Sequence, residues 1–142
     1  MRAPSERIVV DAAILIAAVR GRSFGAVRDA ARYISLATTA RAVEEAKRRI
    51  ELGLKQPELL PLLDALTDDM EVVPFDGLTP LLRDAERSLK SAVPSNNGSI
   101  KDAHLVALAW SLEADVWTTD RDFAGTGIAS WSTPNLLRAL PA

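Results

Sequence analysis

Residues 8–19 read IVVDAAILIAAV, and this stretch decides the fold. An apolar run at residues 8–10 is followed by Asp11 and then by an all-apolar segment at residues 12–19. The first run has the β-branched residues of a buried strand, and the second has the length of a buried helix that stops at Gly21. A strand that passes directly into a helix predicts a βα unit, with Asp11 at the carboxyl end of the strand.

The rest of the chain continues this alternation of strands and helices. We predict further strands at residues 34–37, 71–75, 115–119 and 128–131. We predict helices at residues 24–33, from the N-cap Thr39 to about 52, at 79–92, 101–114 and from about 134, with an interrupted helical segment at 54–66 and a polar loop at 94–99. No repeat or linker divides the chain. Residues 1–142 therefore predict one domain with a three-layer α/β/α fold and a mostly parallel sheet.

Composition restricts the chemistry that the chain can perform. Of its 142 residues 48% are hydrophobic, none is cysteine and one, His104, is histidine. Disulfides, thiol nucleophiles and multi-histidine metal sites are therefore excluded, so catalysis must use carboxylates. The apolar runs are shorter than the roughly 20 residues of a membrane span, and no signal peptide opens the sequence. We expect a cytoplasmic protein that does not enter a membrane.

The net charge of −2 conceals two halves of opposite sign. Residues 1–55 contain 11 Lys and Arg against 6 Asp and Glu, whereas residues 56–142 contain 6 against 13. A basic half beside an acidic half suits a metal site next to a phosphate-binding rim, although ordinary solvated helix faces also produce such a pattern.

The carboxylates most suited to chemistry follow predicted strands. Asp11 and Asp120 each come directly after an apolar strand, and in parallel sheets such ends form the functional edge. Asp102 stands in the first turn of a buried helix, where it either stabilises the helix dipole or faces the same edge. Glu44 and Glu45 lie within a helix, and Glu45 flanks its apolar face more closely; a solvated surface is the alternative for both.

Several carboxylates at one place require a cation, because like charges raise one another's pKa. Mg²⁺ or Mn²⁺ prefers such oxygen ligands, keeps several waters and suits phosphodiester hydrolysis. Asp11, Asp102 and Asp120 are the predicted ligands, and Asp122 is either an outer ligand or a turn residue. Thr118 is predicted to hydrogen-bond a bound water or a phosphate oxygen, or to serve only as a strand former.

At these residues the sequence resembles the PIN-domain nucleases, and in particular the VapC-like toxins of toxin-antitoxin modules. The matching segments occur in the family's order and cover essentially the whole chain: IVVDAAILIAAV at 8–19, RAVEEAKRRI at 41–50, KDAHLVALAWSLEADVWTTDRDF at 101–123 and IASWSTPNLL at 128–137.

The resemblance implies an endoribonuclease that depends on Mg²⁺ or Mn²⁺, with Asp11, Glu45, Asp102 and Asp120 as its acidic residues. Glu45 matches the family better than Glu44 because it directly precedes the core-facing Ala46.

The resemblance also implies an RNA substrate, a homodimer and an antitoxin that covers the catalytic cleft. The leucines of residues 54–66 either accept a helix of that partner or belong to the core. Candidates for binding the RNA backbone are Arg20, Arg22, Arg41, Lys47 and Arg48.

Three other interpretations compete with a nuclease toxin. A phosphotransfer domain also places an aspartate after its first strand, but the phosphatase pattern needs a second aspartate where this chain has Ala13. A catalytically inert PIN-like module has no physical reason to keep mutually repelling carboxylates together. A nuclease that processes RNA, rather than a toxin, fits the same residues.

Overall fold

The computed structural model describes residues 3–21, 24–90, 102–119 and 126–141, and the structural statements below refer to these ranges. Within them, five strands form one sheet in the order β3-β2-β1-β4-β5, and each neighbouring pair is parallel. The strands are β1 (Arg7–Val10), β2 (Ser35–Thr39), β3 (Glu71–Val73), β4 (Asp115–Trp117) and β5 (Ser130–Trp131). The predicted parallel sheet is confirmed.

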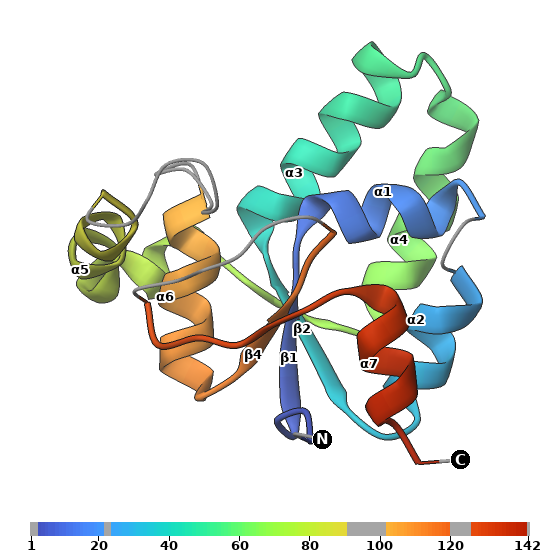
Figure 1. Ribbon diagram of the computed structural model, residues 1–142. Helices are drawn as coiled ribbons and strands as arrows, with labels where there is room; N and C mark the ends of the chain where they lie inside the picture. Colours follow the sequence, from blue (N-terminus) through green and yellow to red (C-terminus); the bar gives the residue numbers. More distant parts are fainter. Residues whose placement is uncertain (1–2, 22–23, 91–101, 120–125, 142) are drawn as a thin grey trace.

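Helices cover both faces of the sheet (Figure 1). One layer contains α1 (Ala12–Val19), α2 (Phe24–Ala31), α3 (Ala40–Arg48), α4 (Leu60–Asp68) and α7 (Thr133–Ala139). The other contains α5 (Thr79–Lys90), α6 (Ala103–Leu112) and the 3₁₀ turn η3 (Phe75–Leu78). The π-helical segment η1 (Arg49–Gly53) and the 3₁₀ turn η2 (Pro57–Leu59) connect α3 to α4. The predicted three-layer α/β/α fold is confirmed.

The apolar stretch at the start of the sequence occupies the centre of this arrangement. Strand β1 pairs with β2 on one side and β4 on the other, and Ile8, Val9 and Val10 are fully buried. Helix α1 is apolar all round because α2, α3 and α4 pack against it. The sequence thus places Asp11 at the junction of two central elements.

The elements differ from the prediction mainly at their ends. Strand β2 extends to Thr39 because Thr38 and Thr39 pair with Val72 and Val73 of β3, and β3 ends at Val73, directly before a proline. The helix capped by Thr39 changes from α to π geometry at Arg49. Strand β4 ends at Trp117. The loop predicted at 94–99 lies outside the described residues.

The leucines of residues 54–66 belong to the core, except Leu62, which is 37% exposed. Leu63 and Leu66 are buried, and Leu54, Leu59 and Leu60 pack against the core with part of their surface exposed. Of the two interpretations of this segment, the structure supports the internal one. None of the described helices is long and apolar enough to cross a bilayer.

Candidate active site

The carboxyl ends of β1, β2 and β4 meet at one edge of the sheet, the upper edge in Figure 1. Asp11 follows β1, Thr38 and Thr39 end β2, and Thr118 follows β4. All four side chains are buried, with Asp11 only 4% exposed. Buried polar groups in such a cluster require partners, and each of these four has a hydrogen bond within it or to the adjoining backbone.

Asp11 is held by hydrogen bonds to both carboxylate oxygens. Its Oδ1 accepts the Ile14 backbone N–H at 2.9 Å, so Asp11 is the N-cap of α1, and its Oδ2 accepts the Thr118 hydroxyl at 2.5 Å. Its own backbone N–H donates to the carbonyl of Trp117 at 3.2 Å. The positive end of the α1 dipole favours the ionised carboxylate at this position.

This environment fits a hard divalent cation. A carboxylate offers about four acceptor sites, so one carboxylate can accept hydrogen bonds and also contribute an oxygen to an ion. The Thr118 hydroxyl orients the carboxylate, in the way that groups behind metal ligands commonly do. Thr118 was predicted either to hydrogen-bond a bound water or a phosphate oxygen or to serve only as a strand former; in the structure its hydroxyl donates to Asp11.

Asp102 lies at the N-terminus of α6, and that helix packs against β1 and β2. Two residues later, Nδ1 of the buried His104 shares a hydrogen bond of 2.7 Å with the hydroxyl of Thr39, at the carboxyl end of β2. This bond fixes the start of α6 at the same edge as Asp11. The Asp102 side chain is 6% exposed and does not cap α6 through a hydrogen bond. Asp102 is the N-cap residue of α6, where a carboxylate also interacts favourably with the helix dipole, so the structure is compatible with both explanations.

Glu45 is exposed on α3, as is Glu44. Residues four apart share a helix face, so Glu45 lies one turn before Arg49 on the same side. Arg49 lines a hollow together with Ala13 of α1, and this side of α3 therefore faces the start of α1. Glu44 is rotated about 100° from Glu45 around the helix axis. Neither glutamate lines this hollow, and the choice of Glu45 stays a prediction.

The described carboxylates do not complete a metal site by themselves. Within the described ranges, no three side chains of His, Cys, Asp or Glu lie close enough together to hold an ion. Asp11 and Thr118 are in direct contact, whereas Glu45 does not join Asp11 and Asp102 in such a group. Asp120 and Asp122 lie outside the described residues.

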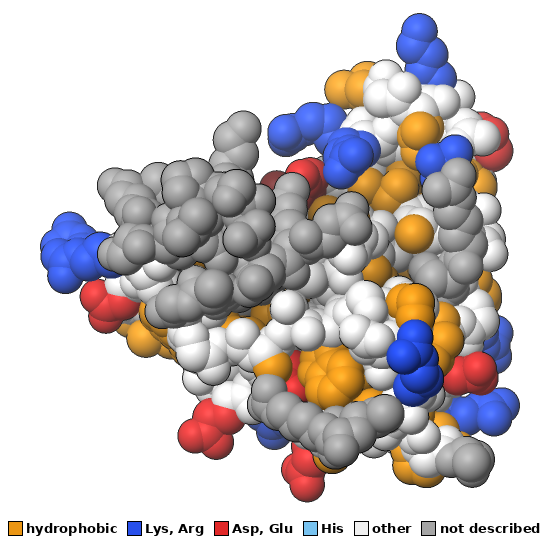
Figure 2. All heavy atoms as spheres, in the orientation of Figure 1, with side chains coloured by type: hydrophobic (Ala, Val, Ile, Leu, Met, Phe, Trp, Pro, Cys, Tyr) orange, Lys and Arg blue, Asp and Glu red, His pale blue; other side chains and the backbone are white. Residues whose placement is uncertain are grey.

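Basic residues lie beside this edge of the sheet, on and near α3. Figure 2 shows Lys and Arg side chains in this region beside acidic ones. The Arg41 guanidinium lies 4.0 Å from the ring centroid of Phe75, and Lys47 is 3.8 Å from Asp64 in an exposed ion pair. The other candidates for RNA contact, Arg20 and Arg48, are exposed, and Arg22 lies outside the described residues.

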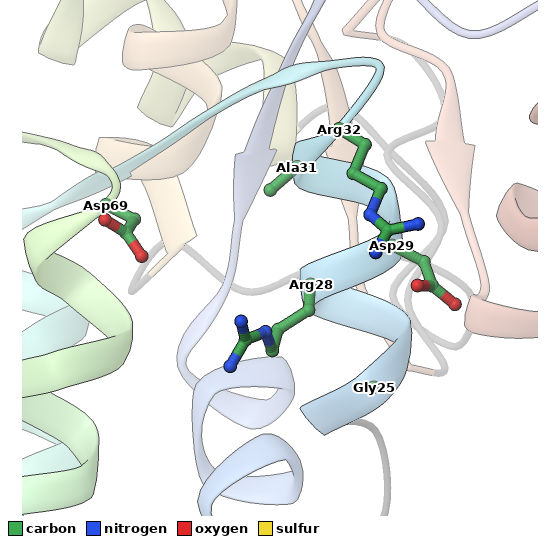
Figure 3. A pocket seen from close by; sticks show the side chains of 6 residues that line it. All are labelled: Gly25, Arg28, Asp29, Ala31, Arg32 and Asp69. Carbon is green, nitrogen blue, oxygen red and sulfur yellow. The ribbon is translucent and has the colours of Figure 1, made fainter.

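A different hollow, of about 390 Å³, lies beside α2, near the end of the sheet where the strands begin. Figure 3 shows Arg28 of α2 and Asp69 after α4 extending into the same space, with Asp29 and Arg32 further along α2. The two acids balance the two arginines, so this hollow carries no net charge to attract an anion.

Sequence reasoning recognised Thr39 only as a helix cap and did not identify Thr38 or the structural partner of His104. Thr39 is an N-cap, since its hydroxyl oxygen accepts the Ala42 N–H at 2.9 Å, and the same hydroxyl contacts His104. The hydroxyl of Thr38 donates to the Val10 carbonyl at 2.7 Å. The available signal was two adjacent threonines at the end of an apolar strand, where polar side chains must find partners.

Comparisons with known proteins agree with this architecture. The FitAcB complex from Neisseria gonorrhoeae contains a chain with a TM-score of 0.67 and 16% identity, over 91% of this chain and 99% of that one. A chain of VapBC2 from Rickettsia felis, bound to a DNA fragment from its promoter, has a TM-score of 0.67 and 14% identity, over 89% of this chain and 98% of that one. PAE2754 from Pyrobaculum aerophilum has a TM-score of 0.61 and 17% identity, over 94% of both chains. At these identities the likeness establishes the fold.

The family assignment rests on the sequence itself. No curated protein matches the chain. The family model described as "PIN domain" matches residues 9–141. This match includes the strand that leads to Asp11, the helix that follows Asp102 and the segment that contains Thr118. The chain therefore belongs to the PIN-domain family of nucleases.

Proposed function

We propose that this protein is an endoribonuclease that requires Mg²⁺ or Mn²⁺ and acts as the toxin of a toxin-antitoxin pair. The observation that carries this proposal is the pair of buried aspartates, Asp11 and Asp102, on elements that meet at the carboxyl edge of the sheet in a PIN domain. Carboxylate oxygens are the ligands that a hard divalent cation prefers.

In this proposal Asp11, Asp102 and Asp120 bind the ion, and Asp122 is an outer ligand. The ion, when bound, lowers the pKa of water and neutralises charge on the phosphodiester. Thr118 holds Asp11 in one orientation through its hydrogen bond. Glu45 accepts a proton from the attacking water, and its exposed position on α3 leaves it accessible to substrate.

The proposed protein partners are inferred from the solved structures that resemble this chain. FitAcB and VapBC2 are complexes, and the sequence resembles VapC-like toxins, so we propose a cognate antitoxin that covers the cleft and a toxin homodimer. Light scattering of the purified protein tests the dimer. Co-expression with the product of an adjacent small gene, followed by co-purification and loss of nuclease activity, tests the antitoxin; an RNA-processing enzyme has no such inhibitor.

The decisive experiment is cleavage of a mixed, structured RNA by the purified protein with Mg²⁺, with Mn²⁺ and with a chelator. We expect metal-dependent cuts that Asp102→Asn abolishes. Asp69→Asn, which changes an exposed aspartate near the opposite end of the sheet, is the matched control and should cleave normally. Absence of cuts, together with absence of metal binding in calorimetry, would identify an inert interaction module instead.

A further inference from the structure

The first turn of α6 contains the only histidine of the chain, His104. Its ring is 3% exposed, and the other residues of α6 are apolar except Ser111 near the end of the helix. A polar ring in such surroundings costs free energy unless it is hydrogen-bonded. The Nδ1 atom of His104 shares a hydrogen bond of 2.7 Å with the Thr39 hydroxyl. An apolar residue would pack here without that requirement, which points to a role for the bond itself.

Thr39 offers His104 a hydroxyl that is already fixed in place. It is fully buried, and its hydroxyl oxygen also accepts the Ala42 N–H at 2.9 Å as the N-cap of α3. Its backbone at the end of β2 is extended, with φ −99° and ψ 153°. A β-branched side chain has few rotamers, and this capping bond selects one of them. The histidine therefore contacts an oxygen that a strand and a helix both hold.

Thr39 lies beside Asp11 in the sheet. Strands β1 and β2 are parallel, and their register pairs Val9 with Ala37. Both chains stay extended for two more residues, so the same register places Asp11 opposite Thr39. Neighbouring strands lie about 4.8 Å apart. Thr39 is therefore a fixed reference point next to the first candidate ligand.

Asp102 stands at the other end of this connection, as the N-cap residue of α6 and two residues before His104. Helix α6 packs against β1 and β2 through apolar side chains, and apolar contacts have no preferred direction. A hydrogen bond depends on both distance and angle. The Thr39–His104 bond therefore fixes the first turn of α6 against the end of β2, and it restricts where Asp102 can lie relative to Asp11.

We propose that Thr39 and His104 are a positioning pair, which holds Asp102 at the separation from Asp11 that a divalent cation requires. Neither side chain of the pair binds the ion, and both act through the helix that begins at Asp102. The pair rests on the proposed metal-dependent nuclease and adds two residues to its site. Ligands of a metal site must be held within about 0.5 Å of their working positions, so loss of the bond should lower the affinity for the ion.

The test measures binding of Mn²⁺ alone to the purified protein, with the free Mn²⁺ determined by electron paramagnetic resonance. His104→Leu removes the bond and leaves the cap of α3 intact, and the Kd for Mn²⁺ should rise roughly tenfold. His104→Asn offers an amide group near the position of Nδ1, so it should recover most of the affinity. Thr39→Val should raise the Kd to the same extent as His104→Leu, whereas Thr39→Ser, which keeps the hydroxyl, should not.

A double variant and a control separate the bond from general loosening of the fold. Because the bond can be lost only once, Thr39→Val combined with His104→Leu should raise the Kd no further than either substitution alone; an additive rise would overturn the pair. Thr67→Val is the matched control, since its buried hydroxyl donates to the Leu63 carbonyl at 3.0 Å within α4, just before β3 begins. It should lower the melting temperature in chelator and leave the Kd unchanged.

Thermal unfolding in chelator verifies that each variant is folded, and the threonine variants carry the test if the histidine variants do not fold. An unchanged Kd in folded Thr39→Val and His104→Leu would overturn the pair, and so would an equal rise in Thr67→Val. RNA cleavage distinguishes the two proposals. If the pair variants bind Mn²⁺ tenfold more weakly but the unmodified protein does not cleave RNA, the pair stands and the nuclease falls; if the unmodified protein binds no Mn²⁺, both fall.

Discussion

Replacing Thr118 with valine removes one hydroxyl from the candidate site and leaves the shape of the side chain nearly unchanged. In the folded protein this hydroxyl donates to Asp11 at 2.5 Å, and both side chains are buried. Hydrogen bonds to charged groups contribute about 1.5–3 kcal/mol, so we expect the free energy of unfolding in chelator to fall by about that amount. For a chain of this length the melting temperature should decrease by roughly 5–10 °C.

Thr38→Val provides a matched control at the neighbouring strand end. Its hydroxyl is equally buried, but it donates to the neutral Val10 carbonyl at 2.7 Å. Loss of a neutral hydrogen bond costs about 0.5–1.5 kcal/mol, so this variant should lose less stability. Urea denaturation of both variants measures the difference, which is attributable to the charge on Asp11.

The same reasoning predicts a coupling between Asp11 and Thr118. In an Asp11→Asn background the acceptor is neutral, so Thr118→Val should cost about as much as Thr38→Val. The Mg²⁺ concentration for half-maximal cleavage should rise about 10–100-fold in Thr118→Val, as is usual when a group behind a metal ligand is removed. Equal costs for the two valine variants in the unmodified background would refute the charge-assisted bond.

Three further changes test other parts of the structure. Asp115→Ala should lower the free energy of unfolding by about 1–3 kcal/mol, because Oδ2 of this buried aspartate accepts the Trp131 indole N–H at 2.9 Å. Measured by urea denaturation, the same substitution should lower that free energy by less in a Trp131→Phe background. Glu45→Gln should reduce kcat for RNA about 10²–10⁴-fold and Glu44→Gln should not, and the reverse result in single-turnover assays would assign Glu44. Gly21→Ala should cost about 1–2 kcal/mol in thermal unfolding, since Gly21 has φ +86° and open space around an added Cβ, which leaves backbone strain as the cause.

The fold was predicted correctly where the hydrophobic pattern of a segment matches the burial of its side chains. Residues 8–19 contain a strand and a helix that are both buried. Because nearly every side chain in them faces the core, their uniform apolar character indicates that both lie at the centre of the fold. The prediction stopped the second strand at Ala37 and assigned Thr39 to the N-cap of the next helix, whereas the side chains of Thr38 and Thr39 are buried. Their partners lie 28 and 65 residues away in the chain, and such contacts leave no local signal.

The candidate site was predictable to the extent that it follows strand ends. Asp11 was identified because it follows an apolar strand, and the structure places it at the predicted edge. The helix of Glu45 was also predicted, but the π turn at Arg49 was not, since no residue pattern here distinguishes π from α geometry. The hollow beside Arg49 depends on how α1 and α3 pack, and helix periodicity alone does not contain that information.

The central position of β1 has a consequence for biosynthesis. The ribosome makes this strand early, yet Val9 pairs with Val116 of β4, and Asp11 obtains the Thr118 hydroxyl only after more than a hundred further residues. The long loop that must close makes this pairing a late and slow event in folding. A nascent chain that stalls before β4 cannot assemble the Asp11–Thr118 pair, so an interrupted round of translation releases a fragment without the proposed centre.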